Sequence, residues 1–409
     1  MPGSAVAGAV RRASGVDCDE RGFPQDCYLA TGVRLRRLSH RRAEPVTRDD
    51  GQNMAHVCRT VGWRSLFSWI VAGILLGVPG CDRASTPSPA TGSATGAGKT
   101  SVGDKQIVIA MLPKLVNIKY FAACRRGAQK AADELGVRLI YDGPTEPSGS
   151  EQNKFIETWI RQGVDAICVA PNQPKTVRRF VQRARSRGIQ VICWDTDSPD
   201  CGRTLMVNQV DDRELGERLI DEIAGQMKQE GKWAIVIASL DAANLNTWRR
   251  HAEARAQSAY PKMVLVDTVV TEENVEVARQ KVETLLNKHP DLKGLIAFDS
   301  NSVPGAAEAL KRTGRVGQVA LTGNSMPEEM RAYIKDGVLE AFYLWDPRAL
   351  GELTVRVAHA LVREQTITQG TQIPGYGPAR LSPADPTMLI LSDPLRFSRE
   401  NIDEYDFSK

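Results

Sequence analysis

The sequence predicts an α/β protein of two lobes, each built on a parallel β-sheet that helices cover on both faces. Short apolar runs alternate with amphipathic helical segments along most of the chain. Glycine follows several of these helical segments, at the position where a helix commonly ends. The alternation occurs in two successive series, and two series of this kind predict two lobes with a cleft between them.

The first series begins with the run 106–112 (QIVIAML), whose continuous apolar character is typical of a buried parallel strand. An amphipathic helix is predicted over 120–135, ended by Gly136. The same pattern then repeats, with strands predicted at 138–141, 166–170 and 190–194 and helices at 151–162 and 175–187.

The second series begins near Asp211 and continues the alternation. Its predicted helices cover 214–230, 247–260, 275–288, 303–312, 327–336 and 349–364, and its predicted strands cover 233–238, 263–270, 294–297, 319–322 and 339–344. The last strong strand ends at Trp345 and Asp346, where we expect the chain to cross back between the lobes.

The charge of the chain is concentrated near its start. Residues 1–80 hold 11 Arg and 7 acidic residues, so of the 53 basic and 49 acidic residues in the chain, 42 of each remain after residue 80. A neutral body argues against nucleic acid as a partner, because phosphate binding needs a concentrated basic face.

The first hundred residues predict an exported, lipid-anchored protein. Residues 66–80 form an uncharged, mostly apolar run that is too short to span a bilayer and suits the core of a secretory signal. The run ends at Val78-Pro79-Gly80-Cys81, which resembles a bacterial lipoprotein cleavage box except at Pro79. We therefore expect a signal peptide over 54–80, lipidation of Cys81 and a flexible tether over 81–104. The alternative is a buried helix with a structural cysteine.

No stable structure is expected in residues 1–53, which precede Met54, where a signal peptide of ordinary length would begin. On this interpretation, residues 1–53 are an artefact of placing the start of translation at Met1 and not at Met54.

The cysteines of the body are Cys124, Cys168, Cys193 and Cys201. Their spacing lacks the paired CxxC pattern of a zinc site, and the histidines form no cluster, so we expect no metal and no cofactor. Export would permit a disulfide, and Cys193 with Cys201 is the nearest pair.

Polar and aromatic side chains follow the predicted strands, where ligands of open parallel sheets bind. The candidate binding residues are Lys114, Tyr120, Phe121, Asp195, Asp197, Asn244, Trp248, Asp299, Asn324 and Trp345. Carboxylates and amides beside aromatic rings suit a sugar, whose hydroxyls need acceptors and donors and whose C–H face packs on a ring. Taken singly, an Asp or Asn at such a place is as often a turn former or helix cap, and either Trp can be core packing.

Several stretches together resemble the periplasmic sugar-binding proteins of ABC importers. These stretches are 109–116 (IAMLPKLV), 141–147 (YDGPTEP), 194–197 (WDTD), 344–346 (LWD) and 401–407 (NIDEYDF). Within that ribose-type superfamily they are most similar to the branch of the autoinducer-2-binding and rhamnose-binding proteins, and the resemblance covers residues 106–407.

The resemblance implies a type I periplasmic binding protein, with two Rossmann-like lobes joined by a three-strand hinge. We expect lobe 1 over 105–209 and about 346–390, and lobe 2 over 210–345 and about 391–409. Lys114 and Asp195 match ligand contacts of the autoinducer-2 binder. Four of its other contacts differ here, falling on Asn244, Leu245, Phe298 and Ser300, and this argues against autoinducer-2 itself.

Matched against ribose-type binders, four residues fall at sugar-contacting positions, namely Asp195, Asp299, Asn324 and Trp345. Trp248 falls near a position usually held by arginine, and Tyr120 and Phe121 match the aromatic pair that holds the sugar ring.

The sequence and the resemblance together predict a monomeric solute-binding lipoprotein that delivers a small neutral monosaccharide to an ABC permease in the inner membrane. The alternative is an autoinducer-2-type signal binder or a sugar sensor that feeds a membrane receptor. An enzyme is not expected, because the sequence lacks a G-x-S-x-G elbow and a placed G-x-G-x-x-G loop.

Overall fold

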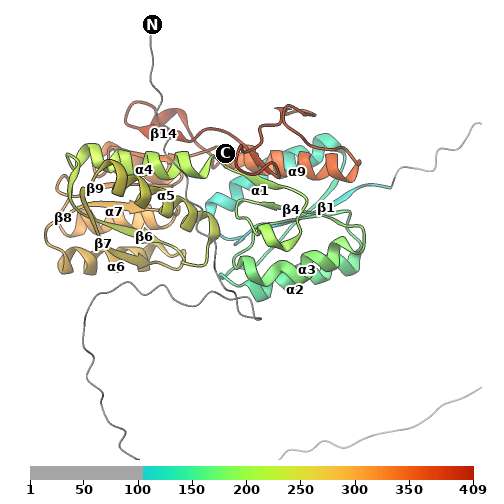
Figure 1. Ribbon diagram of the computed structural model, residues 1–409, viewed down its shortest axis with the longest axis horizontal. Helices are drawn as coiled ribbons and strands as arrows, with labels where there is room; N and C mark the ends of the chain where they lie inside the picture. Colours follow the sequence, from blue (N-terminus) through green and yellow to red (C-terminus); the bar gives the residue numbers. More distant parts are fainter. Residues whose placement is uncertain (1–104) are drawn as a thin grey trace, which may run out of the picture. The chain divides into compact units, whose positions relative to one another are not determined.

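The computed structural model describes residues 105–409 (Figure 1). The predicted segments 1–53, 54–80 and 81–104 and the lipidation of Cys81 lie outside the described residues. Within 105–409 no helix combines the length and the apolar character needed to cross a bilayer. The same part of the chain contains no cluster of three or more His, Cys, Asp or Glu side chains arranged to hold a metal ion.

The first sheet has six strands in the order β13-β5-β4-β3-β1-β2, all parallel to their neighbours. We call the part built on it lobe 1. Its strands are β1 (Val108–Leu112), β2 (Arg138–Tyr141), β3 (Ala166–Val169), β4 (Gln190–Trp194), β5 (Met206–Asn208) and β13 (Met388–Ile390). Its helices are α1 (Lys119–Leu135), α2 (Gly149–Gln162), α3 (Pro174–Arg185) and α9 (Pro347–Val362). A short 3₁₀ turn, η1 (Pro199–Cys201), follows β4.

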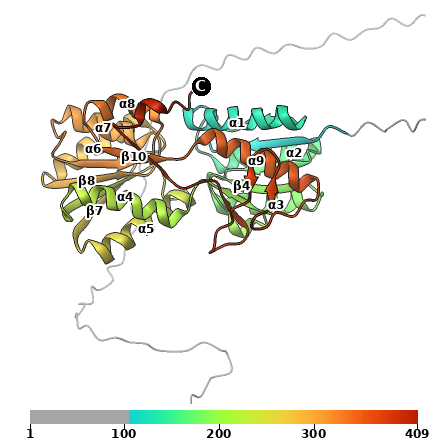
Figure 2. The same ribbon diagram turned by 90° about the horizontal axis from the view of Figure 1, so that it is seen from above.

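Both faces of this sheet are buried, which explains its continuous apolar strands. Along β1, Ile109 and Met111 belong to the core cluster shared with α1 and α9. Ala110 and Leu112, which alternate with them, belong to the cluster shared with α2 and α3. Figures 1 and 2 both show α1 and α9 on one side of the sheet and α2 and α3 on the other. Polar side chains are therefore excluded from the strands and gather at their ends.

The second sheet has four parallel strands in the order β7-β6-β8-β9, and we call the part built on it lobe 2. The strands are β6 (Glu230–Ile237), β7 (Lys262–Val270), β8 (Leu292–Ala297) and β9 (Ala320–Gly323). The helices are α4 (Asp212–Gln226), α5 (Ala243–Ala259), α6 (Val275–Lys288), α7 (Ser302–Arg312) and α8 (Pro327–Lys335). Figures 1 and 2 show α4 and α5 on one side of this sheet and α6 and α7 on the other.

An antiparallel pair, β10 (Ala341–Leu344) with β14 (Leu395–Ser398), lies beside β9 through the bridge between Asn324 and Tyr343. The chain ends in a 3₁₀ turn, η2 (Ile402–Glu404), after a small hairpin of β11 (Gln372–Ile373) and β12 (Gly377–Pro378).

Three chain segments join the lobes, after β5, after β10 and after β13. The first and third run side by side, because Leu391 N–H donates to Asn208 O at 2.9 Å and Ser392 N–H donates to Gln209 O at 3.2 Å. The predicted α/β fold with parallel sheets and a three-strand connection is therefore confirmed.

Some predicted boundaries were wrong. Helix α5 begins at Ala243 and not at 247, so Asn244 lies in its first turn and not in a loop before it. The strands β5, β11, β12, β13 and β14 have two to four residues each, too short for apolar periodicity to reveal them. The four cysteines of the described part, Cys193 and Cys201 included, are buried free thiols.

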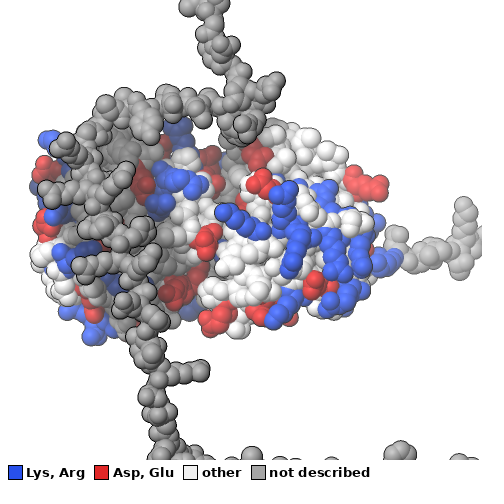
Figure 3. Space-filling model, turned by 60° about the horizontal axis from the view of Figure 1, so that its bottom comes forward, with Lys and Arg blue, Asp and Glu red and all other residues white. Residues whose placement is uncertain are grey.

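Lysine and arginine side chains gather on one face of lobe 1 (Figure 3). Helix α3 contributes Lys175, Arg178, Arg179 and Arg183, all of them exposed. The balance of charge over the whole body therefore does not hold for each surface. The expectation that nucleic acid is not a partner used that balance, and it stays a prediction.

Helices α1 and α9 pack at unusually short range because glycine lies at their crossing. A Cβ built on Gly351 would come within 1.9 Å of Cys124 O, and one built on Gly127 within 1.8 Å of Arg348 O. Each glycine thus lies against the backbone of the other helix. Helix α9 begins two residues after Trp345, so the contact between α1 and α9 also fixes the place where the chain passes from lobe 2 to lobe 1.

We predict that Gly351→Ala destabilises the protein by about 1–3 kcal/mol, because a methyl group at this crossing forces the helices apart. Chemical denaturation of the variant and the native protein measures the difference. Gly225→Ala is the control, since Gly225 lies exposed near the end of α4 with no atom within 4 Å of the added Cβ. It should leave stability unchanged or raise it slightly. An equal effect of the two substitutions would contradict the prediction.

Candidate functional site

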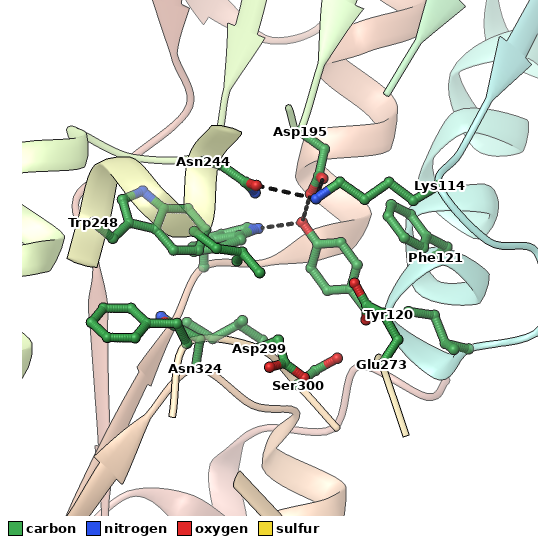
Figure 4. Close-up of a pocket in the computed structure, with 15 residues that line it drawn as sticks. Lys114, Tyr120, Phe121, Asp195, Asn244, Trp248, Glu273, Asp299, Ser300 and Asn324 are labelled. Atoms are coloured by element: carbon green, nitrogen blue, oxygen red, sulfur yellow. Dashed lines mark hydrogen bonds and ion pairs between the residues drawn. The ribbon is translucent and has the colours of Figure 1, made fainter. Parts of the chain in front are cut away.

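A pocket lies between the lobes, at the carboxyl ends of both parallel sheets. Nine of the ten predicted binding residues line it, namely Lys114, Tyr120, Phe121, Asp195, Asn244, Trp248, Asp299, Asn324 and Trp345. Six further residues complete the lining, namely Ile118, Leu245, Glu273, Phe298, Ser300 and Leu344. Figure 4 shows Lys114 and Asp195 on one side of the Tyr120 ring and Asp299, Ser300 and Glu273 on the other.

Lys114 follows β1 and is held by a buried glutamine of α2. The Gln152 side-chain amide donates to Pro113 O at 3.0 Å and to Ala170 O at 2.8 Å, which fixes the chain just before Lys114. The Lys114 ammonium lies 3.3 Å from the Asp195 carboxylate and donates to the Asn244 side chain at 3.1 Å. Because Asn244 belongs to lobe 2, this lysine connects the two lobes.

Asp195 follows β4 in a left-handed backbone conformation, with φ of 61°. Few residues other than glycine adopt this conformation, and such strain concentrates at functional sites. It turns the carboxylate into the pocket, where it accepts hydrogen bonds from Tyr120 Oη at 2.9 Å and Gln209 Nε2 at 2.9 Å. Gln209 also donates to Asp195 O at 2.8 Å and belongs to the first segment that joins the lobes.

Aromatic rings form one wall of the pocket. Trp345 and Tyr120 lie edge to face, with ring centroids 6.1 Å apart, and Trp248 packs against Trp345 at 5.7 Å. The Trp345 indole N–H donates to Tyr120 Oη at 3.0 Å, and the Tyr120 hydroxyl in turn donates to Asp195. Burial, together with the Asp195 charge, raises the pKa of Tyr120 well above its usual value. The hydroxyl therefore keeps its proton and orients both partners.

Trp248 is positioned by a buried carboxylate at the start of α4. Its indole N–H donates to Asp212 Oδ1 at 2.7 Å, and burial raises the pKa of Asp212. Trp248 is 2% exposed, so it serves both the core of lobe 2 and the wall of the pocket.

Asp299 follows β8 and also stabilises the turn before α7. Its carboxylate accepts from the backbone N–H of Ser302 at 2.9 Å and of Asn301 at 3.2 Å, and from the Ser302 hydroxyl. Burial raises the pKa of Asp299. Asp299 thus both stabilises this turn and lines the pocket.

Asn324 follows β9, and its side-chain N–H donates to Tyr343 O at 3.4 Å. Its side-chain oxygen is buried and has no hydrogen-bond partner among residues 105–409. A buried acceptor without a donor is costly, so a hydroxyl of a bound ligand would satisfy it.

The structure does not bring Asp197 to the pocket. Its carboxylate pairs with Arg203, with N–O distances of 2.5 and 2.7 Å, and Arg203 also lies 3.2 Å from Asp385. Asp197 therefore ties the end of β4 to the C-terminal segment of lobe 1. The link from Arg203 to Asp385 could not be predicted from local patterns, because Asp385 lies far along the chain.

Glu273 is the charged pocket residue that sequence reasoning missed. It lies in the loop between β7 and α6 and is half-buried. Burial and the neighbouring Asp299 raise the pKa of Glu273 from 4.5 to about 7, an effect that Lys114 opposes. The other candidates are polar residues that follow a predicted strand. Residues 271–274 also follow a predicted strand, so the same rule could have found Glu273.

The arrangement suits a small polyhydroxy ligand. The pocket presents carboxylate oxygens as acceptors, an ammonium group and side-chain amides as donors, and ring faces for C–H groups. A ligand missing one hydroxyl would leave a buried polar group unpaired, so such a site discriminates well.

We predict that Tyr120→Phe destabilises the ligand-free protein by about 1–3 kcal/mol, because the Trp345 indole N–H loses its acceptor while buried. Chemical denaturation measures the change. Tyr260→Phe removes a hydroxyl bonded to Asp221 at 2.8 Å in a more exposed place and should cost less than about 0.5 kcal/mol. A Tyr120→Phe protein as stable as this control would show that the hydroxyl is not needed.

We also predict that the contribution of Glu273 makes stability fall as the pH rises. Its pKa in the folded protein, about 7, lies above the ordinary 4.5, so the folded state binds more protons between these values. The stabilisation is therefore fully present below about pH 4.5 and is lost as the pH rises through 7. Melting temperatures between pH 5 and 8 should fall for the native protein relative to Glu273→Gln. A constant difference between the two proteins would refute this.

Comparison with known proteins agrees with the fold. Residues 109–366 match the family model described as a periplasmic binding protein domain. The ribose import binding protein of Bacillus subtilis is 25% identical over 274 residues, which are 66% of this chain and 86% of that protein.

Two solved structures resemble the chain over 73% of its length. The LsrB protein from Clostridium saccharobutylicum in complex with AI-2 is 25% identical, fully covered and superimposes with a TM-score of 0.69. A solute-binding protein from Clostridium phytofermentas with bound L-rhamnose is 25% identical, 98% covered and superimposes with a TM-score of 0.70. Because the family model spans more than half of the chain, which folds into two lobes around a pocket, the protein belongs to the periplasmic binding protein domain family.

Proposed function

We propose that this chain is the solute-binding protein of an ABC transporter. It binds one small neutral monosaccharide, rhamnose-like or ribose-like, in the pocket between the lobes and delivers it to a permease in the inner membrane. No bond of the sugar is broken, and the protein needs no cofactor or metal.

The pocket itself carries the proposal. It joins acceptors, donors and aromatic rings from both lobes, as a monosaccharide requires, and its Asn324 oxygen has no partner within the described residues. Binding between two lobes also explains signalling to a permease, since a bound sugar stabilises the arrangement in which both lobes contact it.

The relatives support the sugar class. One is named as a ribose import binding protein, and one solved structure holds L-rhamnose. AI-2 is the second candidate, because the LsrB structure holds it. The sequence resemblance also implies that Lys114 and Asp195 match ligand contacts of the autoinducer-2 binder. Against AI-2 stand Leu245, Phe298 and Ser300, which line the pocket where that resemblance expects other side chains.

We propose further that the protein is a monomer, exported to the periplasm and tethered by a lipid on Cys81. This part rests on the apolar run 66–80, the cysteine that follows it and the Ser/Thr/Gly-rich segment after Cys81. Mass spectrometry of the N-terminal peptide of the membrane fraction would reveal the lipid on Cys81.

We predict that one neutral sugar raises the melting temperature of the purified protein in a panel of L-rhamnose, D-ribose, other monosaccharides and AI-2. A ligand at 100 times its dissociation constant adds ~2.7 kcal/mol of stability, which a thermal-shift assay detects readily. A shift with AI-2 alone would replace the sugar proposal by the signal-binding one. A well-folded protein that responds to no compound of the panel would refute both.

We predict that Asp195→Asn lowers affinity for the bound sugar at least tenfold, because Lys114 loses its charged partner and the ligand loses a carboxylate acceptor. Asparagine tolerates the left-handed conformation of this position. Asp197→Asn is the matched control, two residues away and outside the pocket, and it should retain the native affinity. Isothermal titration of both variants measures the effect, and equal affinities would remove Asp195 from the binding site.

A further inference from the structure

Three carboxylates line the pocket and face a single cationic side chain. Asp195 lies 3.3 Å from Lys114, and Asp299 accepts hydrogen bonds from the turn before α7. The Glu273 carboxylate makes no hydrogen bond and no ion pair with any residue of the described part, 105–409. Among the three, Glu273 is therefore the carboxylate whose charge is available to interact with a ligand.

The backbone holds Glu273 in this place firmly. Glu272 and Glu273 have φ values of 58° and 57°, in the left-handed region that a chain adopts when its surroundings impose it. Asn301 Nδ2 donates to Glu273 O at 2.7 Å, and Glu272 N–H donates to Ala238 O at 2.9 Å. These two residues and their bonds fix the place at which the Glu273 side chain leaves the backbone.

The approach to the pocket is acidic as well. A hollow of about 390 Å³ shares Lys114 and Glu273 with the pocket and draws its lining from both lobes. Three exposed carboxylates, those of Glu146, Asp241 and Glu272, belong to this lining. The charged groups that face Glu273 are thus Lys114, Asp195 and Asp299 on the inner side and these three carboxylates on the outer side. Carboxylates outnumber cations on both sides, which gives the cleft a negative potential.

We propose that Glu273 sets the charge selectivity of the pocket: it admits neutral sugars, favours a sugar with an amino group beside it, and excludes sugar acids and sugar phosphates. The proposal rests on the proposed function, because it specifies which class of sugar the same pocket takes.

The physical reason is the absence of a counter-charge. A neutral sugar can donate a hydroxyl to Glu273, whereas an anionic group would add a fourth negative charge to a poorly solvated site. An ammonium group would supply the missing partner and form a charge-assisted hydrogen bond. Burial and the neighbouring Asp299 raise the pKa of Glu273, which agrees with a carboxylate that lacks a close cationic partner.

The test compares native protein, Glu273→Gln and Glu273→Asn in isothermal titration at pH 8. Glutamine preserves the shape of the side chain, and asparagine suits the left-handed backbone if glutamine impairs folding. The probes are L-rhamnose, D-ribose and D-glucose as neutral sugars, D-glucosamine and D-galactosamine as amino sugars, and D-glucuronate and D-galacturonate as acids. Glu272→Gln is the matched control, since it removes the neighbouring exposed charge outside the pocket.

The native protein should bind a neutral or amino sugar and leave the acids at least a hundredfold weaker. Relative to its affinity for the same neutral sugar, each Glu273 variant should bind an acid at least tenfold better than the native protein does and bind amino sugars at least tenfold worse. Glu272→Gln should behave as the native protein within threefold.

Selectivity between acid and neutral sugar that stays within threefold of native in both Glu273 variants would overturn the inference. So would acid binding by the native protein that matches its best neutral sugar. If the native protein binds a neutral sugar and the Glu273 variants keep its selectivity, only this inference is refuted. A folded native protein that binds no sugar of any class refutes the proposed function itself.

Discussion

Covering a parallel sheet on both faces leaves its strands no side that faces water. A polar side chain cannot be buried within such a strand without losing its hydrogen bonds, so polar groups are confined to the ends. The sheet of lobe 1 obeys this constraint, and the carboxyl ends of both sheets point to the same pocket. The location of the site thus follows from the packing of helices on the sheets, before any particular binding residue is considered.

Asp195 shows how that confinement produces an ordered site. A buried carboxylate must be paired, and its partners come from three parts of the chain: Lys114 after β1, Tyr120 in α1, and Gln209 where the chain leaves lobe 1. Through Tyr120 the same network reaches Trp345, where the chain returns from lobe 2. The groups that we expect to contact a ligand are therefore bonded to two of the segments that join the lobes. A ligand that moves these groups therefore acts directly on the joining segments, and no longer chain of contacts has to carry the change.

Sequence reasoning predicted the long elements and most of the pocket, because both follow from local patterns. Apolar runs such as 106–112 identify strands, and the residue after a strand identifies a candidate for the site. It failed where position depends on distant partners. Asp197 follows the same strand as Asp195, yet it pairs away from the pocket with Arg203, which also pairs with the distant Asp385. The three-residue strand β13 is a strand because β5 lies beside it, and no periodicity in three residues can reveal that. Glu273 enters the pocket through a left-handed backbone that its own sequence, without glycine, does not suggest.

Because the chain passes between the lobes three times, the order of its elements also decides when each lobe can be completed during synthesis. Helix α9 and strand β13, which belong to lobe 1, come from residues 347–390, after the whole of the lobe 2 sheet. Strand β14, which pairs with β10 beside lobe 2, comes later still. Neither lobe can close its core until the ribosome has made nearly the entire chain, so contacts far apart in sequence form late and together. The nascent protein therefore remains without a finished lobe for most of its synthesis, and the pocket is assembled in the final step.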